Sequence, residues 1–353
     1  MKEQMKALVC HGDGSISLED RTVPVLLEDT DAIVRVTLST ICMSDLHIMR
    51  GAVPRAVPET VLGHEFVGEI VSVGSSVQNL RPGDRVAANC ITFCGDCYYC
   101  RKGFINNCEK GGWELGCRID GCQAEYVRVP FAQRGLTKIP DSVTDENALF
   151  VGDILSSGYF GAELCEISPG DTVAVIGAGP VGLCSMLCAR LFGAARIIAL
   201  DIDLDRLSFA KEQGLADIAL SPEEAGWEDV LAEATHGRGA DGVIEAAGGQ
   251  NTFALTFKIA RANSVVALLA MYEENQIFPL PSMYGKNLIF KTGGVDAVHC
   301  ERLLELISLG KINTDFLITH KAPLNDILKG YEVFGERKDH CYKWAVTPYE
   351  EQL

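Results

Sequence analysis

The chain has 353 residues, of which 47% are hydrophobic and 22% are charged. This length favours two domains of ordinary size, and the apolar share supports a buried core and excludes general disorder. The 31 basic and 48 acidic residues give a formal net charge of -17, which disfavours binding to nucleic acid or to an anionic membrane surface.

The chain also lacks the usual signals for secretion and membrane insertion. Its first residues, 1–6, are polar and contain no apolar core of a signal peptide. The longest uncharged stretch, 172–189, contains glycines and a proline, and it predicts a strand that turns into a helix. Fourteen cysteines in this context indicate reduced thiols that serve a metal or catalysis. We therefore expect a cytoplasmic protein that binds neither membrane nor nucleic acid.

The first 150 residues predict a β-rich domain. Apolar and polar residues alternate with the period of a strand in 31–38, 64–73 and 124–129. Sequences typical of turns, such as 81–84, separate these segments.

After about residue 171, short apolar runs alternate with helical segments, as is typical of a parallel sheet covered on both faces. The expected fold is a doubly wound parallel sheet of Rossmann type, 154–294, inserted in a β-rich domain made of 1–153 and 295–353. The predicted strands are 172–176, 196–200, 241–246, 264–271 and 342–347, and the predicted helices are 181–192, 204–213, 228–235, 252–262, 300–309 and 324–334.

A glycine-rich sequence at 177–182 follows a predicted strand and opens a predicted helix. In that context G-x-G-x-x-G is typical of a dinucleotide-binding turn, where the glycines permit a tight turn and close approach of a pyrophosphate. Asp201 ends the next predicted strand, where a carboxylate would bind ribose hydroxyls and repel a 2′-phosphate. NAD is therefore predicted rather than NADP, and a turn without a ligand is the alternative. The predicted cofactor residues here are Gly177, Gly179, Pro180, Val181, Gly182 and Asp201.

Seven of the fourteen cysteines lie between Cys90 and Cys122. Four of them follow the spacing C-x2-C-x2-C-x7-C, and four thiolates in one short loop can enclose a zinc ion with no position open to substrate. Other cysteines nearby, Cys90, Cys117 and Cys122, are alternative ligands, and a cluster of ordinary buried thiols is the alternative without metal. The predicted ligands of this structural zinc are Cys94, Cys97, Cys100 and Cys108.

A second set of candidate ligands is dispersed along the chain. Cys42 and His64 offer a thiolate and an imidazole, which are typical ligands of a catalytic zinc with one open position. A third ligand is required, and Asp153 stands at the expected junction of the two domains. Taken singly, each has an ordinary interpretation, as a core cysteine, a hydrogen-bonded core histidine and a helix cap.

Taken together, these motifs resemble those of the zinc-containing medium-chain alcohol dehydrogenases across essentially the whole chain. The resemblance rests on Cys42, the sequence Gly-His-Glu-Phe-Val-Gly at 63–68, the four-cysteine segment and the glycine turn, in that order. It implies a GroES-like catalytic domain, a catalytic and a structural zinc, and a homo-oligomer that is a dimer or a tetramer. Cys42 and His64 match ligands of the catalytic zinc, and Glu65 matches a residue that either joins the metal or lies just behind it. Asp153 replaces a second cysteine, as in bacterial secondary-alcohol dehydrogenases and formaldehyde dehydrogenases.

The resemblance also implies roles around the catalytic zinc. Ser44 matches the hydroxyl that takes the alcohol proton, and His47 matches the outer end of this proton relay, with a plain surface histidine as the alternative. Trp113 matches a substrate-pocket tryptophan of the secondary-alcohol branch, or else is a structural aromatic residue. Lys343 matches a basic residue at the cofactor pyrophosphate, or else is a solvated lysine. The implied reaction is reversible hydride transfer between an alcohol, expected to be a small secondary alcohol, and NAD, which gives a ketone from a secondary alcohol or an aldehyde from a primary one.

Several alternatives remain open at this point. Some secondary-alcohol dehydrogenases lack the structural zinc and prefer NADP, and this chain departs from them in both respects. A polyol or amino-alcohol dehydrogenase of sorbitol or threonine type would keep both sites and differ in the substrate pocket. An enoyl or quinone reductase needs no catalytic zinc, and the net charge opposes a zinc-ribbon protein that binds nucleic acid. A non-catalytic NAD-binding protein is the last alternative. Segments 264–272 and 278–288 suit a contact between copies of the chain.

Overall fold

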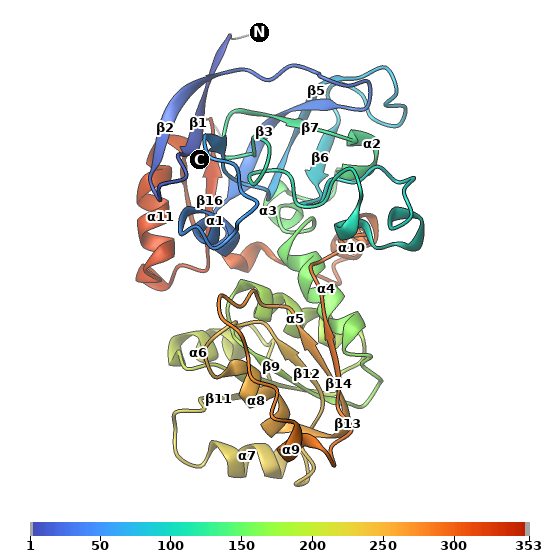
Figure 1. Ribbon diagram of the computed structural model, residues 1–353, viewed down its shortest axis with the longest axis vertical. Helices are drawn as coiled ribbons and strands as arrows, with labels where there is room; N and C mark the ends of the chain where they lie inside the picture. Colours follow the sequence, from blue (N-terminus) through green and yellow to red (C-terminus); the bar gives the residue numbers. More distant parts are fainter. Residues whose placement is uncertain (1–2, 350–353) are drawn as a thin grey trace. The chain divides into compact units, whose positions relative to one another are not determined.

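The computed structural model describes residues 3–349 and divides into two compact units (Figure 1). One unit consists of Met1–Ser156 and Asp296–Leu353, and the other consists of Ser157–Val295. The chain therefore builds most of the first unit, then the whole second unit, and finally completes the first.

Two sheets form the first unit, as its β-rich sequence predicts. A small sheet has the order β2-β1-β4, and a larger sheet has the order β15-β16-β3-β5-β6-β8, with β7 paired to β3. All pairs are antiparallel except β15 with β16. The strands are β1 (Gln4–Cys10), β2 (Ile16–Thr22), β3 (Ala32–Thr40), β4 (Thr60–Val61), β5 (Phe66–Val73), β6 (Arg85–Ala88), β7 (Tyr126–Val129), β8 (Leu136–Lys138), β15 (Ile318–Pro323) and β16 (Lys343–Thr347).

Strand β3 organises the larger sheet. Successive side chains of a strand point to opposite faces, and Val34 and Val36 lie on the face that packs into one core cluster with Phe66 of β5. The register places Ser39 opposite Phe66, and Thr40 opposite Ala345 of β16. The C-terminal end of β3, the start of β5 and strand β16 therefore meet at one end of the sheet.

Short helices complete the first unit. Helix α11 contributes Tyr331 and Phe334 to a core cluster that also contains Leu46 of α1 and Trp344 of β16. Helix α4 (Ile154–Leu164) begins in the first unit and ends in the second. The remaining helices are α1 (Met43–Met49), α2 (Ala132–Gly135), α3 (Asp145–Ala148), α10 (Cys300–Ser308) and α11 (Ile327–Gly335), with 3-10 turns at Cys100–Lys102, Ile105–Asn107, Asp315–Leu317, Leu324–Asp326 and Lys338–His340.

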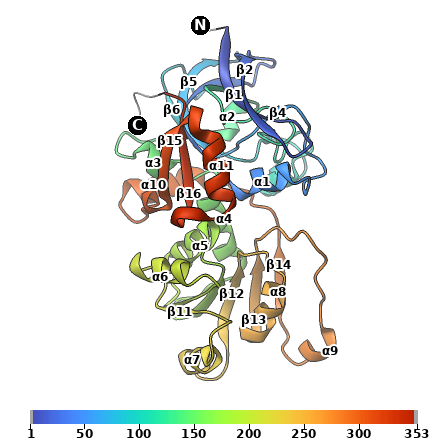
Figure 2. The same ribbon diagram turned by 90° about the vertical axis from the view of Figure 1, so that its left-hand side faces the viewer.

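The second unit is a six-stranded parallel sheet in the order β11-β10-β9-β12-β13-β14 (Figure 1, Figure 2). Counted along the chain, this is the order 3-2-1-4-5-6 of the Rossmann fold, which confirms the predicted doubly wound sheet. The direction of winding reverses between β9 and β12, the place where such sheets bind dinucleotides. The strands are β9 (Thr172–Ile176), β10 (Arg196–Leu200), β11 (Ile218–Leu220), β12 (Ala240–Glu245), β13 (Ala260–Leu268) and β14 (Ile289–Thr292).

Helices cover both faces of this parallel sheet. Right-handed crossovers place α5 and α6 on one face and α8 on the other. Among the described residues, no helix combines the length and the apolar character needed to cross a bilayer. The helices are α5 (Pro180–Leu191), α6 (Leu204–Glu212), α7 (Trp227–Ala234), α8 (Thr252–Ile259) and α9 (Leu280–Met283).

Several element limits differ from the prediction, two of them at helices whose ends the sequence does not mark. The helix predicted over 252–262 ends at Ile259, and strand β13 starts at the next residue. No glycine or proline marks this change, so the apolar pattern runs on without a stop signal. The helix predicted over 324–334 begins as a 3-10 turn and becomes α-helical at Ile327.

Candidate active site and metal centres

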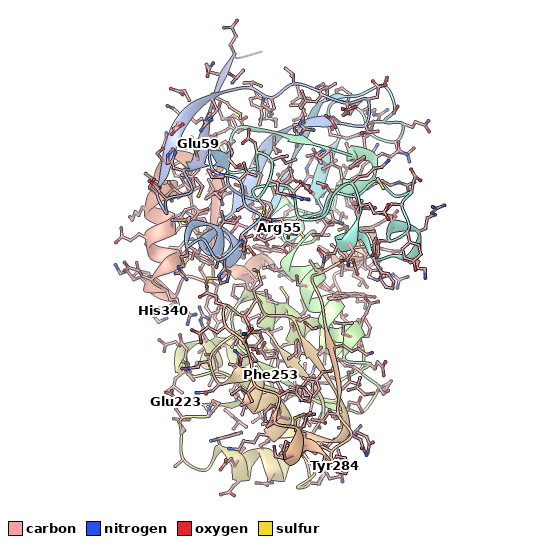
Figure 3. All side chains as sticks on the ribbon, viewed as in Figure 1. Arg55, Glu59, Glu223, Phe253, Tyr284 and His340 are labelled. Carbon is pink, nitrogen blue, oxygen red and sulfur yellow. The ribbon has the colours of Figure 1, made fainter. Side chains whose placement is uncertain are left out.

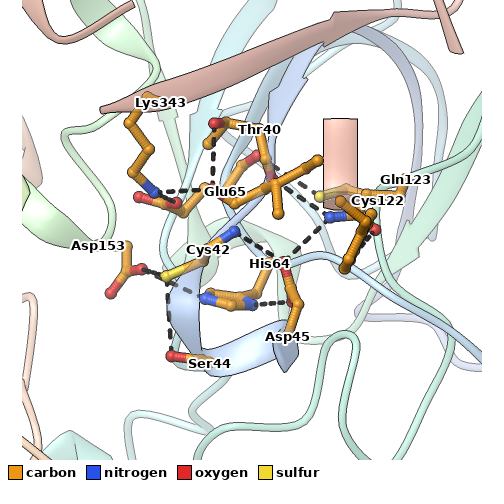
Figure 4. A network of polar contacts seen from close by, with 12 residues as sticks. Thr40, Cys42, Ser44, Asp45, His64, Glu65, Cys122, Gln123, Asp153 and Lys343 are labelled. Atoms are coloured by element: carbon orange, nitrogen blue, oxygen red, sulfur yellow. Dashed lines mark hydrogen bonds and ion pairs between the residues drawn. The ribbon is translucent and has the colours of Figure 1, made fainter. Parts of the chain in front are cut away.

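Four potential metal ligands converge in the first unit (Figure 4). Cys42 Sγ, a ring nitrogen of His64 and carboxylate oxygens of Glu65 and Asp153 all lie within 4.8 Å of one another. Cys42 Sγ lies 3.8 Å from Asp153 Oδ2, and His64 Nε2 lies 3.3 Å from the same oxygen. All are buried except Asp153, which is partly buried. The four dispersed residues that the sequence predicts as ligands thus lie together.

The strands explain this convergence. Cys42 comes shortly after the end of β3, and His64 and Glu65 come directly before β5, its neighbour in the sheet. Asp153 follows Gly152, whose backbone lies so close to Ala88 of β6 that a Cβ would overlap the carbonyl oxygen. Glycine is therefore required beside Asp153 for this segment to reach the sheet.

A buried carboxylate, Asp45, orients two of the ligands. Its Oδ2 accepts hydrogen bonds from the backbone N–H of Cys42 at 2.9 Å and from Nε2 of Gln123 at 3.0 Å. Its Oδ1 lies 3.3 Å from Nδ1 of His64, as an ion-pair contact. A carboxylate behind a metal-binding histidine fixes the ring and its tautomer. Sequence reasoning missed Asp45, although an acidic residue in the first turn of the helix after Cys42 was a usable signal.

The charges at this site fit a divalent cation. Burial lowers the pKa of His64, but the negative charges of Asp45 and Asp153 outweigh burial and hold this pKa well above its usual value. Oε1 of Glu65 is buried and has no hydrogen-bond partner in the part of the chain that the structure describes. Several carboxylates around one imidazole leave excess negative charge in a buried place, which a cation would balance. A donor set of sulfur, nitrogen and carboxylate oxygen suits zinc.

Lys343 forms a buried ion pair with Glu65. The Nζ of Lys343 contacts Glu65 Oε2 and donates a hydrogen bond to the carbonyl of Ile41 at 3.3 Å. Burial raises the pKa of Glu65 to about 7, and the charge of Lys343 opposes this rise. Lys343 is therefore not the solvated lysine of the alternative, and its contact with the cofactor pyrophosphate stays a prediction. Strand β16 is bound to β3, which turns this side chain toward the metal ligands.

Ser44 and His47 both lie on α1, which begins next to Cys42. Oγ of Ser44 is 3.7 Å from Sγ of Cys42, so the hydroxyl stands beside a ligand atom (Figure 4). His47 follows three residues later, a spacing that places two side chains on the same face of a helix. The helix therefore holds both residues of the predicted proton relay.

Trp113 lies beside a metal ligand. The centroids of its ring and the His64 ring are 5.6 Å apart, with an angle of 68° between the planes. The indole also packs against the core cluster that contains Leu46 and Trp344. Its Nε1–H is buried and lacks an acceptor among the described residues, so packing and ring contacts fix its position.

The four-cysteine segment forms a second compact ligand set. The sulfur atoms of Cys94, Cys97, Cys100 and Cys108 all lie within 4.8 Å of one another. Hydrogen bonds from the backbone at Glu109 and Cys100 lower the pKa of Cys97 to about 6, whereas burial raises the pKa of Cys100 to about 12. Backbone N–H groups of Cys94 and Lys110 also point at Cys108 Sγ, at 3.3 and 3.4 Å. Four crowded thiols with N–H donors around them match the usual environment of a structural zinc.

The alternative ligands of this segment lie elsewhere. Cys122 contacts the carbonyl oxygen of Glu65 at 3.5 Å, and the pKa of the buried Cys90 thiol is raised by burial and by the charge of Asp153. Cys117 is buried near Arg118. The described residues thus assign the cluster to the four predicted cysteines alone.

In the second unit, the glycine turn joins β9 to α5. A Cβ at Gly182 would overlap the carbonyl oxygen of Gly177, so helix and strand pack at a distance that only glycine permits. Pro180 opens the helix and Val181 follows, as predicted. Asp201 Oδ2 accepts a hydrogen bond of 2.7 Å from the backbone N–H of Ala178. Asp201, the predicted acidic residue, is thus hydrogen-bonded directly to the glycine turn.

A basic residue stands beside the same turn. Nη1 of Arg206 lies 3.3 Å from the place that a Cβ of Gly179 would take, and its Nε is 3.6 Å from Asp203 Oδ2. Sequence reasoning considered only the residue directly after Asp201. An arginine in the first turn of α6 was the signal that could have revealed it. The positive charge of Arg206 partly offsets the negative charge of Asp201.

Known proteins share both units. The family model of the alcohol dehydrogenase GroES-like domain matches residues 28–141, and that of the zinc-binding dehydrogenases matches residues 180–302. An alcohol dehydrogenase from Cupriavidus necator is 38% identical over 99% of this chain and 100% of its own length. An NADP-dependent isopropanol dehydrogenase from Entamoeba histolytica is 34% identical over 91% of this chain and 89% of its own. The solved structure of the alcohol dehydrogenase TADH from Thermus sp. ATN1 has a TM-score of 0.89 and 36% identity, and the match covers 97% of this chain and 99% of that one.

A GroES-like unit with clustered metal ligands and a Rossmann unit with a glycine turn define a class of zinc-dependent oxidoreductases. Within that class, the chain belongs to the zinc-containing medium-chain alcohol dehydrogenase family. It is an alcohol dehydrogenase that uses zinc and a nicotinamide cofactor on small-molecule substrates.

Proposed function

We propose that this enzyme oxidises small secondary alcohols reversibly with NAD and that Cys42, His64 and Asp153 hold its catalytic zinc. The observation that supports this best is the buried convergence of these three side chains and Glu65 within 4.8 Å. Glu65 either joins the metal or lies just behind it. Its unpartnered Oε1 supports the first role and its pairing with Lys343 supports the second.

The residues around the ligands would move the proton. When bound, zinc would lower the pKa of the alcohol hydroxyl, and NAD would accept the hydride. The hydroxyl of Ser44, next to Cys42, is placed to take the alcohol proton because it can accept one proton and donate another. We propose that His47, on the same face of α1, receives that proton, since an imidazole titrates near neutrality.

We propose a second, structural zinc in the four-cysteine segment, giving two zinc ions per chain. Four sulfur atoms within 4.8 Å of one another support this assignment. Because all four protein ligands are cysteines, the site would leave no open position for substrate, and its effect would be on stability.

The cofactor is proposed to be NAD rather than NADP. A carboxylate at Asp201, held against the glycine turn at Ala178, would bind the ribose hydroxyls and repel a 2′-phosphate. Arg206 beside Gly179 weakens that repulsion. We expect kcat/KM to be higher with NAD than with NADP, and equal values with both cofactors would contradict the proposal.

The proposed substrate class rests on Asp153 and Trp113. The indole beside His64 would restrict the space near the metal to small or flat groups. An isopropanol dehydrogenase is among the relatives, which supports a small secondary alcohol. A polyol or amino alcohol, as for sorbitol- or threonine-type dehydrogenases, is the alternative.

A substrate panel tests this proposal. The zinc-loaded enzyme is assayed with NAD and primary alcohols, small secondary alcohols, polyols and 3-hydroxy amino acids, and kcat/KM is compared. A tenfold lead for small secondary alcohols, roughly 1.4 kcal/mol of transition-state preference, would support it. A lead for a polyol or an amino alcohol would favour the alternative, and no oxidation of any member would contradict the proposed reaction.

We further propose a cytoplasmic homo-oligomer, a dimer or a tetramer. Strand β14 is an edge strand of the parallel sheet and carries the exposed Ile289, and the exposed Phe278 packs its ring 5.0 Å from that of Phe290 on this strand. Tyr284, labelled in Figure 3, is exposed in the segment that precedes β14 in sequence. Apolar groups beside an open strand edge favour pairing with another copy. Light scattering coupled to size-exclusion chromatography tests this, and a monomer at micromolar concentration would contradict it.

A further inference from the structure

A guanidinium group stands next to the ring of Trp113. Arg55 is exposed, in the loop between α1 and β4, and is labelled in Figure 3. Its Cζ lies 5.2 Å from the centroid of the Trp113 ring, and the same ring lies 5.6 Å from the imidazole of His64. A single aromatic ring therefore separates the proposed metal centre from a fixed positive charge.

A second arginine nearby, Arg118, forms an ion pair, whereas Arg55 forms none among the described residues. Burial raises the pKa of the Cys117 thiol, and both Arg55 and Arg118 oppose that rise, so both guanidinium groups lie near this thiol. Arg118 is paired with Glu114, whose two carboxylate oxygens it contacts, one at 3.0 Å. No carboxylate of residues 3–349 forms an ion pair with Arg55 within 4.0 Å. The local positive charge that remains is that of Arg55.

Arg55 also forms a hydrogen bond with the Cys117 thiol, which engages one N–H of the guanidinium and leaves its other donors available. A guanidinium that contacts an aromatic face is held by attraction to the ring, while its N–H groups point outward in its own plane. Two of these groups can donate parallel hydrogen bonds to a carboxylate or a phosphate. In a chain with 48 acidic residues, an arginine that forms no ion pair among the described residues, this close to the candidate metal ligands, is a feature suited to binding an anion.

We propose that Arg55 binds an anionic group of the substrate, so that the preferred alcohol carries a carboxylate or a phosphate on a short chain. This inference rests on the proposed function and makes Arg55 a specificity-determining residue for it. Trp113 would lie along the carbon chain of such a substrate, between the hydroxyl near His64 and the anion near Arg55.

The competing explanation is that Arg55 only steadies Trp113. The indole N–H has no acceptor among the described residues, so the cation contact is one of the interactions that hold the ring. In that case a loss of Arg55 would change the pocket for every substrate equally. The proposal instead requires a loss confined to anionic substrates and expressed mainly in KM.

Matched substrate pairs separate the two explanations. The zinc-loaded enzyme is assayed with NAD on 2-butanol against 3-hydroxybutyrate, and on propane-1,2-diol against its 1-phosphate. The variants are Arg55→Gln, Arg55→Lys and, as a control with the same loss of charge at an exposed site, Arg81→Gln. Zinc content and thermal melting confirm that each variant is folded.

We expect the wild type to favour one anionic member over its neutral partner, and the carboxylate and phosphate arms show which anion it prefers. Arg55→Gln should raise KM for that anion by about tenfold to a hundredfold, the size of a lost charge-assisted contact, with little change for the neutral partner. The KM of Arg55→Lys for that anion should lie between the values of the wild type and Arg55→Gln, because lysine keeps the charge but not the planar pair of donors. Arg81→Gln should match the wild type.

Two results would overturn the inference. The first is no preference for either anionic member in the wild type, and the second is a similar loss on neutral and anionic substrates in Arg55→Gln. If the wild type oxidises neither member of either pair and no other alcohol, the proposed function itself has failed, which is a distinguishable outcome.

Discussion

Asp45 joins the metal centre to the fold although it is not among the clustered ligands. It accepts hydrogen bonds from the backbone of Cys42 and from Gln123, and it lies 3.3 Å from the far nitrogen of His64. The side-chain amide oxygen Oε1 of Gln123 in turn accepts a hydrogen bond of 2.7 Å from the hydroxyl of Tyr331 in α11. The position of one imidazole thus depends on a chain of contacts that reaches the C-terminal helix.

Exchange of Asp45 for asparagine should therefore weaken zinc binding without removing a ligand. The neutral amide loses the charge that steadies the His64 ring, and such outer contacts typically affect metal affinity by about 10- to 100-fold. Competition with a chelator measures the affinity. Asp120→Asn is the matched control, since Asp120 also accepts a backbone hydrogen bond, from Val61, but is exposed and belongs to neither ligand cluster. Equal zinc affinity in both variants would contradict this role.

Replacement of Ser44 by alanine should slow turnover and leave the metal in place. The hydroxyl lies beside Cys42 and is proposed to take the alcohol proton, and acid–base groups of this kind contribute about 10²- to 10⁴-fold. Steady-state kcat and zinc content are measured together. Ser75→Ala, at an exposed turn, should leave both unchanged. A Ser44→Ala enzyme with normal kcat would remove this residue from the proton path.

At the scale of whole elements, the glycine turn between β9 and α5 depends on close backbone packing. Gly182→Ala should weaken NAD binding by about tenfold or more, because a Cβ would push α5 away from Gly177 and so move the N–H groups that are proposed to bind the pyrophosphate. Calorimetric titration with NAD measures this. Gly285→Ala is the control, since a Cβ there meets no atom within 4 Å and its backbone needs no positive φ. Unchanged affinity in Gly182→Ala would exclude the turn as the binding site.

Asp241 of β12 forms side-chain hydrogen bonds with residues of the two neighbouring strands, β9 and β13. It accepts hydrogen bonds from the backbone of Thr172 at 2.9 Å and from Arg261 at 2.7 Å. Although burial raises the pKa of Asp241, these partners outweigh burial and hold it below its usual value. The carboxylate therefore stabilises the fold above the usual aspartate pKa, and this stabilisation is lost as pH falls through the lowered value.

Asp241→Asn should accordingly lower the free energy of unfolding by about 1–2 kcal/mol at neutral pH. The difference between the variant and the wild type should shrink once pH drops below about 4, since the wild-type carboxylate is then increasingly protonated. Urea denaturation at several pH values measures this. If the difference in unfolding free energy between the wild type and Asp241→Asn stays constant down to strongly acidic pH, the charge of Asp241 is not the source of that difference.

The same elements show how far the sequence alone could lead. Alternation in β3, the fully apolar strands of the second unit and the glycine spacing each reflect local rules, so the fold was predictable, and the cysteine spacing predicted the four-cysteine cluster. The dispersed set of Cys42, His64, Glu65 and Asp153 was implied only by the family resemblance. The partner of Lys343 was not predictable, because Glu65 lies 278 positions away and only the pairing of β16 with β3 brings the two together. Arg55 was missed for a similar reason. Its relation to Trp113 arises from the path of two loops, which follow no periodic pattern.

For the molecule as a whole, the four-cysteine segment should govern stability more than chemistry. Cys100→Ser should reduce the zinc content from the proposed two ions per chain to one and lower Tm by several degrees, since a structural zinc contributes to folding energy. Near 25 °C, kcat should remain within about threefold of the wild type, because the proposed catalytic ligands are unchanged. Cys188→Ala, which removes a buried thiol outside both clusters, should keep two zinc ions. Loss of both ions in Cys100→Ser would show that the centres are not independent.

The pairing of β3 with β5 has a consequence for how the chain matures. Cys42 leaves one strand just where His64 enters the other, in a register fixed by Ser39 opposite Phe66. A slip of one residue would shift these ends by about 3.3 Å and turn side chains to the opposite face. Such a misaligned chain would present an incomplete set of ligands. Zinc binding by the proposed catalytic ligands would therefore require the correct register of β3 and β5, whereas zinc binding by the four-cysteine segment, which lies outside these strands, would not.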